Sequence, residues 1–326
     1  MQDLYEADHA KYPNTIFMTT EQFSRDMYDG WRRAEKHSWI LGEFIWSGID
    51  YIGEVGSGSS ELRTIGGKLP DFPYVTELWD YPAYLSGCGE VDISGKRKPQ
   101  GLYRDVLWGR SALELLVQRP LPDGKFERVS DWGWHDELES WTWSVPAGQA
   151  ITVRAYTSGD AVTLLLNGKP IGAKSVTDGD KLKAEFSVLY MPGTLEAIAY
   201  KNGAEIGRKT LETVDPPAAL RLVAERSRIA ASANDLGYVA IEVCDAKGRK
   251  VPDGLIPVTV SVSGAANLRA TGSANPRGLK DFRSPHVTTF HGEALAIVQP
   301  GTARGEVRVT AFSPGLTPHT ISIAVG

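Results

Sequence analysis

Carboxylates are the side chains of this sequence whose positions suggest catalysis. Glu21 directly follows a short apolar run at residues 15–19 and precedes a segment with helical periodicity. In a parallel sheet or barrel, catalytic groups project from the carboxyl ends of the strands, which makes Glu21 a candidate catalytic acid. A glutamate in the first turn of a helix also interacts favourably with the helix dipole. Position alone does not decide between these two roles.

Three further acids surround a second apolar run at residues 39–46. Glu43 lies inside that run, and Asp50 and Glu54 lie just after it. For each of these acids, the pattern alone favours a structural or hydrogen-bonding role over a catalytic one.

Aromatic side chains gather near these acids, at predicted strand ends or in loops: Trp46, Tyr51, Trp79, Tyr81 and Tyr84. Exposed aromatic rings beside carboxylates can hold sugar rings through apolar contact. A single Trp more often belongs to a core, but the clustering favours a binding site. The sequence Asp-Trp-Gly-Trp-His at 131–135 could also form a ligand platform, although we expect its two Trp to seal a join between domains.

The sequence gives little support for other kinds of catalytic or binding site. The glycines do not form a dinucleotide or phosphate loop, there is no G-x-S-x-G motif, and the six His show no metal-ligand spacing. Cys88 and Cys244 lie far apart and are expected to be buried thiols. Acidic residues (40) exceed basic ones (35), which argues against a nucleic-acid partner, and no apolar run is long enough to span a membrane. We therefore expect no metal or cofactor.

The elements around Glu21 predict an α/β region over residues 1 to about 110. Apolar runs at 15–19 and 39–46 predict strands, separated by a helix over 22–36 with an apolar stripe at three- and four-residue spacing. A long glycine-rich loop follows, and then a helix near 102–108. Strand, helix, strand and helix is the order of a parallel sheet or barrel. A complete (β/α)8 barrel needs about 250 residues, so this segment predicts only the last quarter to third of one.

In the remaining chain, apolar and polar residues alternate with a period of two, which is typical of strands. Asn167–Gly168 and Asn202–Gly203 predict hairpin turns, and Asp215-Pro216-Pro217 predicts a domain boundary. All nine Trp lie between residues 31 and 143, so the two ends of the chain differ chemically. The predicted fold is a multidomain α/β plus all-β chain: part of a TIM barrel at 1–120, an immunoglobulin-like sandwich at 121–215 and a second one at 216–326. Strands of the second sandwich are expected near 220–224, 238–244, 258–262, 294–298, 307–311 and 320–325.

The sequence resembles a known enzyme family over nearly its whole length. Residues 39–54, WILGEFIWSGIDYIGE, resemble the signature of glycoside hydrolase family 2 β-galactosidases around the eighth barrel strand. Thr19-Thr20-Glu21 is similar to the nucleophile motif of the seventh strand, and residues 88–108 resemble the stretch that closes such barrels. Residues 162–172 and those from Pro217 onward are similar to the immunoglobulin-like domains that follow the barrel.

This resemblance implies a retaining glycosidase with two carboxylates about 5–5.5 Å apart. Glu21 matches the nucleophile and Trp46 matches the residue that lines the sugar pocket. We expect Asp50, Tyr51 and Trp79 to contribute to substrate binding. The acid/base of the family lies in an Asn-Glu pair on the fourth barrel strand, and no Asn-Glu pair occurs in this sequence.

The implied substrate is a terminal β-galactoside, and we expect the chain by itself to be inactive. An incomplete barrel should leave strands exposed until the missing N-terminal part, or another chain, completes it. Two alternatives stay open: a non-catalytic carbohydrate-binding or interaction module built on the sandwiches, and a β-glucuronidase or β-mannosidase activity. The N-terminus is polar and lacks the apolar core of a signal peptide. Members of the family occur in several compartments, so the location stays open, with a periplasmic or secreted one favoured.

Overall fold

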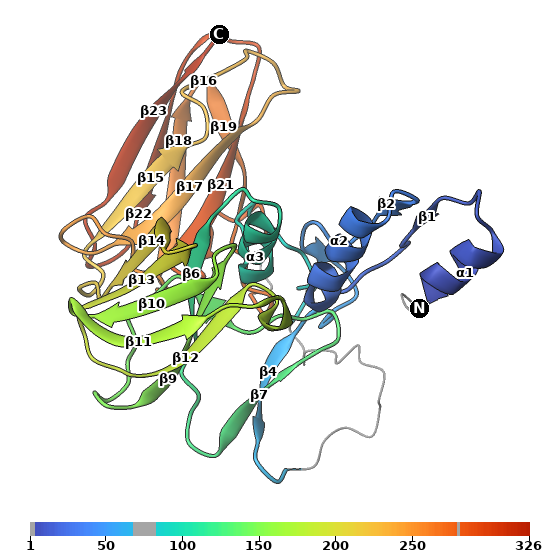
Figure 1. Ribbon diagram of the computed structural model, residues 1–326. Helices are drawn as coiled ribbons and strands as arrows, with labels where there is room; N and C mark the ends of the chain where they lie inside the picture. Colours follow the sequence, from blue (N-terminus) through green and yellow to red (C-terminus); the bar gives the residue numbers. More distant parts are fainter. Residues whose placement is uncertain (1–3, 68–82, 279–280) are drawn as a thin grey trace. The chain divides into compact units, whose positions relative to one another are not determined.

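The computed structural model describes residues 4–67, 83–278 and 281–326, so Trp79 and Tyr81 lie outside the described residues. The chain forms two compact units (Figure 1). The first unit runs to residue 211. Among the described residues it leaves out Ala83 and residues 140–144, which belong with residues 212–326 in the second unit. Among the described residues, none of the helices combines the length and the apolar character that crossing a membrane requires.

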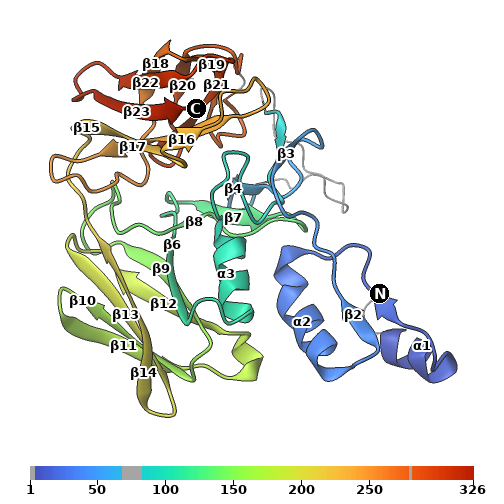
Figure 2. The same ribbon diagram turned by 90° about the horizontal axis from the view of Figure 1, so that it is seen from above.

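The first unit begins with the predicted strand, helix and strand. After α1 (Tyr5–Lys11), strand β1 (Phe17–Met18) pairs in parallel with β2 (Ile40–Gly42), and α2 (Met27–Lys36) connects them (Figure 2). A single 3-10 turn, η2 (Ser24–Asp26), precedes α2, so the helical segment begins two residues later than predicted.

Both parallel strands are shorter and more open than the sequence suggests. Ile16 and Leu41 are each 71% exposed and Phe44 is 56% exposed, whereas Ile40 is buried. Ile16 lies just before β1, so the strand is shorter than the predicted run at 15–19 and the first large apolar side chain of that run is in solvent. A two-stranded parallel sheet lacks the neighbours that would cover its edges and its second face.

The glycine-rich loop contains short antiparallel pairs, and a helix closes it. Strand β3 (Tyr51–Ile52) pairs with β5 (Leu85–Ser86), and β4 (Ser60–Thr64) pairs with β7 (Lys125–Val129). Helix α3 (Pro99–Leu107) confirms the predicted helix and starts at a proline, whose fixed φ suits a first helical turn. Side chains of α2 and α3 share a core cluster with the sandwich that follows: Met27, Tyr28, Tyr103, Val106, Leu116 and Tyr156.

The first sandwich has two four-stranded sheets, in the orders β11-β10-β13-β14 and β12-β9-β6-β8. Its strands are β6 (Leu113–Gln118), β8 (Glu137–Leu138), β9 (Ala150–Thr157), β10 (Ala161–Leu166), β11 (Lys169–Ser175), β12 (Lys183–Leu189), β13 (Thr194–Lys201) and β14 (Ala204–Glu212). Both Asn-Gly hairpin predictions are confirmed, because Asn167 and Gly168, like Asn202 and Gly203, have positive φ angles. Strand β6 belongs to this sandwich, although it precedes residue 121.

The second sandwich confirms all six predicted strands. Its sheets have the orders β15-β17-β21-β19 and β16-β23-β22-β18-β20. The predicted strands are β15 (Ala219–Ala224), β17 (Gly237–Cys244), β18 (Pro257–Gly264), β21 (Glu293–Pro300), β22 (Gly305–Phe312) and β23 (His319–Val325), and the unpredicted ones are β16 (Arg228–Ile229), β19 (Ala266–Gly272) and β20 (His286–Thr288). Valine, isoleucine, leucine and alanine fill the core between the sheets. Cys88 and Cys244 are both buried and free, as predicted.

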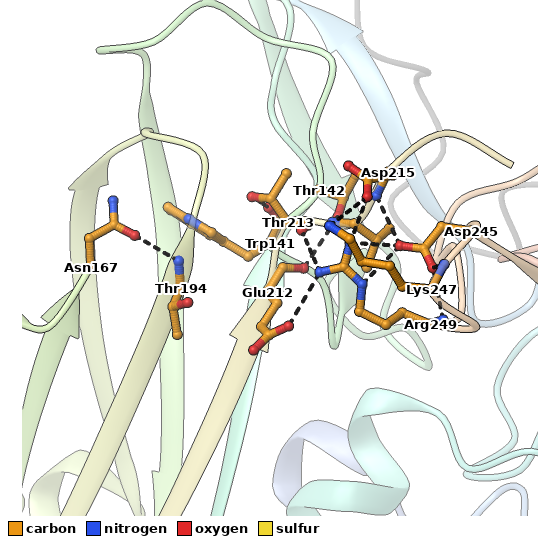
Figure 3. Close-up of polar contacts among 11 residues, drawn as sticks. Trp141, Thr142, Asn167, Thr194, Glu212, Thr213, Asp215, Asp245, Lys247 and Arg249 are labelled. Carbon is orange, nitrogen blue, oxygen red and sulfur yellow. Dashed lines mark hydrogen bonds and ion pairs between the residues drawn. The ribbon is translucent and has the colours of Figure 1, made fainter.

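Arg249 ties the entry segment of the second unit to its sandwich (Figure 3). Its guanidinium donates to the Asp245 carboxylate at 2.8 Å, to Asp215 at 3.2 Å and to the Thr213 carbonyl at 3.3 Å. Burial raises the pKa of Asp245, but hydrogen bonds from Arg249 and from the amides of Asp215 and Lys247 outweigh it and hold that pKa at about 2.

Residues 140–144 join the same unit beside this entry segment. The Thr213 hydroxyl donates to the Trp141 carbonyl at 2.7 Å, and the Val214 amide donates to the Thr142 hydroxyl at 3.0 Å. Trp141 is fully buried. The second unit therefore takes in a piece of chain that lies some 70 residues before the rest of it.

Candidate active site

Glu21 and Trp46 lie on one face, where two parallel chain segments end. Beyond β1 and β2, Gln22 still pairs in parallel with Ile45, and the Trp46 amide donates to the Gln22 carbonyl at 3.1 Å. Side chains alternate between the two faces of extended chain, so Glu21 and Trp46 lie opposite to Gln22 and Ile45. Gln22 is 2% exposed whereas Trp46 is 39% exposed, and Glu21 is also exposed. The carboxylate and the indole are thus presented together on the open face.

Glu21 has a partner that the sequence did not predict. The Trp132 indole Nε1 donates to Glu21 Oε1 at 2.8 Å, and the Trp132 ring meets Phe23 edge-on at 4.8 Å. Arg25 pairs with Asp131 at 2.8 Å and so joins the same two segments. This arrangement fixes one carboxylate oxygen. Within the described part of the chain, nothing is bound to the other oxygen, Oε2.

Trp46 is held by Tyr51, which is itself bound to Glu54. Its Nε1 donates to the Tyr51 hydroxyl at 3.0 Å, and that hydroxyl donates to the Glu54 carboxylate. Desolvation, reinforced by the bond to Glu54, raises the pKa of Tyr51, so this hydroxyl stays protonated as a donor at neutral pH. The bonds fix the edge of the Trp46 indole and leave part of its ring open to solvent.

Asp50 is engaged inside the fold. Its carboxylate accepts hydrogen bonds from Lys98 Nζ at 3.0 and 3.2 Å and from the Gly89 amide at 2.8 Å, and it is 7% exposed. Burial raises its pKa, and the Lys98 charge opposes that shift. A Cβ on Gly89 would lie 2.1 Å from the Asp50 amide nitrogen, so only glycine fits this approach. These contacts describe a structural acid, and a direct role of Asp50 in substrate binding stays a prediction.

A buried ionic cluster connects the second strand to α3. Arg104 Nη1 donates to Glu43 Oε1 at 3.0 Å and its Nε donates to Glu90, with side chains no more than 9% exposed. Burial raises the pKa of Glu43 and of Glu90, while Arg104 opposes both shifts. Glu43 thus has the structural, hydrogen-bonding role that the pattern favoured, three residues before Trp46.

Three other acids of the βα region are already bound to basic side chains. The carboxylates of Glu43, Asp50 and Glu90 are all bound to lysine or arginine, so none of these three is free to protonate a leaving group. Trp79 lies outside the described residues, so the structure does not place it. Over residues 4–67, 83–278 and 281–326, no three His, Cys, Asp or Glu side chains are arranged to hold a metal ion.

Comparisons with known proteins point to one family. Residues 220–322 match glycoside hydrolase family 2 C-terminal domain 5, and residues 148–207 match a domain of unknown function, DUF4982. The chain is 28% identical over 291 residues to beta-galactosidase BoGH2A of Bacteroides ovatus, which covers 88% of this chain and 29% of that protein. It is 25% identical over 260 residues to a putative beta-glucuronidase of Formosa agariphila, which covers 78% of this chain and 21% of that protein.

A solved structure extends the similarity to the whole chain. A glycosyl hydrolase family 2 member from Bacteroides cellulosilyticus superposes with a TM-score of 0.89 and 31% identity, over 99% of this chain and 41% of that one. The chain thus spans less than half the length of each of these relatives. The domain match, the sequence relatives and the shared fold agree, and the chain belongs to glycoside hydrolase family 2.

Proposed function

We propose that this chain carries the nucleophile of a retaining glycosidase that acts on terminal β-D-galactosides. Glu21 attacks the anomeric carbon, while a second acid protonates the departing oxygen and then activates water. The observation that supports the proposal is the parallel pairing of Gln22 with Ile45, because each of these residues is next in sequence to an exposed candidate, Glu21 or Trp46. Trp132 orients the carboxylate, and the Trp46 ring supplies apolar surface for the sugar.

The barrel assignment and the domain limits are part of this proposal. Strands β1 and β2 with helices α2 and α3 would be the last two βα units of a (β/α)8 barrel, within residues 1–120, followed by sandwiches at 121–215 and 216–326. The exposed side chains of Ile16, Leu41 and Phe44 would then contact the rest of the barrel. That part would be supplied by a longer protein that contains this chain, or by another chain.

The choice of galactoside is supported by the match to the Bacteroides ovatus beta-galactosidase. A β-glucuronidase is the second candidate, because the chain also matches a putative beta-glucuronidase over 78% of its length. Both candidates use the same nucleophile. Their sugars differ in the group on carbon 5, hydroxymethyl or carboxylate, and in the configuration of the hydroxyl on carbon 4. The residues that read these groups are not identified among those described.

The test compares nitrophenyl β-D-galactoside with the β-D-glucuronide. We expect no turnover by the 326-residue chain alone, because general acid–base catalysis is worth about 10²–10⁴-fold and the second acid is not in this sequence. In a protein that joins this chain to a complete family barrel, we expect galactosidase activity and a loss of at least about 10³-fold in kcat for Glu21→Gln.

Glu35→Gln is the matched control, since Glu35 lies on the exposed side of α2 and pairs only with Arg32 in the described structure. We expect its kcat to stay within about twofold of the parent value. Turnover by the chain alone that Glu21→Gln abolishes would show that the site is complete here. Full activity of Glu21→Gln in the longer protein would exclude Glu21 as the nucleophile.

A further inference from the structure

An exposed ion pair, Arg25 with Asp131, lies beside the proposed nucleophile. Arg25 Nη1 donates to Asp131 Oδ1 at 2.8 Å, across 106 positions of the sequence. The two side chains are 48% and 38% exposed, and an ion pair in solvent contributes little to folding stability. Asp131 directly precedes Trp132, the donor to Glu21, so this pair can act on the site rather than on the fold as a whole.

The turn that carries Asp131 and Trp132 is fixed at its base by backbone contacts. The Ser130 amide donates to the Ser59 carbonyl at 2.9 Å, and the Gly133 amide donates to the Ser130 carbonyl at 2.9 Å. A Cβ on Gly133 would lie 2.7 Å from the Ser59 carbonyl oxygen, so this close approach requires glycine. Ser59 and Ser130 are both buried, and the base of the turn is therefore held in one place.

The open side of the turn contacts the Glu21 segment through side chains. The Trp132 indole donates to Glu21, and its ring meets Phe23 edge-on. The Arg25 guanidinium lies 5.0 Å from the centroid of the same Phe23 ring while it binds Asp131. These side chains thus form one continuous set of contacts, with the ion pair at one end and the bond to the nucleophile at the other.

The hydrogen bond between Trp132 and Glu21 competes with water. Glu21 is exposed and Trp132 is only half-buried, so both partners can be solvated when the bond opens. A second link between the same two segments keeps the partners close and reduces the entropy that is lost when the bond forms again. The ion pair between Arg25 and Asp131 is such a link.

We propose that Arg25 and Asp131 are positioning residues, whose ion pair keeps the Trp132 indole on Oε1 of Glu21 and so leaves Oε2 to attack the anomeric carbon. This inference rests on the proposed function of Glu21. Neither Arg25 nor Asp131 contacts the sugar in this arrangement. Loss of the pair should therefore lower kcat, which depends on the orientation of the carboxylate, and leave KM nearly unchanged.

The first measurement follows the Trp132 indole N–H in the 326-residue chain by nuclear magnetic resonance, with Trp132→Phe to assign its signal among those of the nine Trp. Glu21→Gln should shift this signal, because the acceptor loses its charge. Arg25→Gln should raise the rate at which this hydrogen exchanges with water about three- to fivefold, and Arg25→Lys should stay near the parent rate. This measurement needs no catalytic activity, so it tests the ion pair independently of the proposed function.

The second measurement uses nitrophenyl β-D-galactoside and the longer protein that joins this chain to a complete family barrel. Trp132→Phe should lower kcat at least about tenfold, because a hydrogen bond to a charged group is lost. Arg25→Gln and Asp131→Asn should each lower kcat about three- to fivefold, with KM within about twofold of the parent value. In the Trp132→Phe background, Arg25→Gln should cause no further loss, since the pair acts through the indole.

Arg32→Gln is the matched control, because Arg32 forms another exposed ion pair, with Glu35 at 2.9 Å on α2. It should change neither the Trp132 signal nor kcat. Unchanged thermal unfolding verifies the fold of each variant.

The proposal is overturned if Arg25→Gln leaves the exchange rate of the Trp132 indole N–H and kcat at their parent values. It is equally overturned if Arg25→Gln lowers kcat as much in the Trp132→Phe background as in the parent, because Arg25 would then act on Glu21 or on the sugar directly. Full activity of Glu21→Gln would overturn the proposed function instead, and the exchange rates would still show whether the ion pair holds the indole.

Discussion

The parallel βα region and the second sandwich use apolar side chains in opposite ways. In the sandwich, Val239, Ile241 and Val309 are fully buried between two sheets that the same segment of chain provides. In the βα region, Ile16 and Leu41 are mostly exposed although they flank or belong to parallel strands. An antiparallel sandwich completes its core from neighbouring strands, whereas a parallel pair depends on strands from elsewhere.

The pKa values of carboxylates shift in opposite directions in the same two regions. Burial raises the pKa of Glu43, Asp50 and Glu90 in the βα region, and their partners offset this only in part. In the second sandwich, Asp235 and Asp245 each accept several hydrogen bonds and have a pKa of about 2. Desolvation is the largest effect on the pKa of each of the three acids in the βα region, whereas hydrogen bonds from backbone amides and arginine prevail at Asp235 and Asp245.

Hydrogen exchange should show the largest difference between the regions. We expect amides of β1, β2, β3 and β5 to exchange at least about 10³-fold faster than those of β17 and β21, because core strands open only with the whole domain. Helix α3 should be intermediate, since it packs against Leu116 and Tyr156. Mass spectrometry of peptides measures this. Equal protection of β1 and β21 would contradict the view that the βα region lacks its partners.

A matched pair of isoleucine substitutions should separate the two kinds of apolar residue. Ile241→Ala in the second sandwich should cost about 2–5 kcal/mol of unfolding free energy, because it leaves a cavity in a closed core. Ile16→Ala should change stability by no more than about 0.5 kcal/mol, because that side chain is already in solvent. Urea unfolding followed by far-UV circular dichroism tests both. A large loss for Ile16→Ala would show that this side chain is covered in solution.

Acidification should produce a smaller effect, of opposite sign in the two regions. Glu43, Asp50 and Glu90 have raised pKa values, so the folded βα region binds protons more readily and gains stability as the pH falls from neutral toward about 4. Asp235 and Asp245 have a pKa of about 2, so their contribution is constant above about pH 4 and is lost between about pH 4 and 2.

Hydrogen exchange corrected for intrinsic rates at pH 7, 5 and 3 measures these trends. Asp50→Asn should reduce the gain in the βα region and leave the second sandwich unaffected. Parallel changes in both regions would contradict the assignment of opposite pKa shifts.

Local sequence patterns were sufficient to predict most strands of the second sandwich and both Asn-Gly hairpins. Asn-Gly pairs have a direct backbone consequence, and alternating Val and Ile residues mark a half-buried strand wherever it lies. Strand β19 was missed because its sequence, ANLRATG, has too few apolar residues to alternate clearly. Strand β6 was missed for the opposite reason, since all six of its residues are buried and its pattern has no period.

Local sequence patterns did not predict which side chains bind the acids of the candidate site. The rule that catalytic groups project from the ends of parallel strands identified Glu21 as a candidate, and the family resemblance identified Trp46. Trp132 donates to Glu21 from 111 residues away, and Arg104 binds Glu43 from 61 residues away. Such pairs depend on the tertiary fold, which no spacing in the sequence reveals.

The inclusion of residues 140–144 in the second unit has a consequence for how this protein can be divided. Among the described residues, the chain passes between the two units near residues 83, 139, 144 and 211, so no single cut separates them. A gene fusion that transferred residues 212–326 to another protein would leave Trp141 and Thr142 behind, together with their bonds to Thr213 and Val214. Transfer of the second sandwich to another protein would therefore require residues equivalent to 140–144 as well, and recombination at one junction would break the bonds of Trp141 and Thr142.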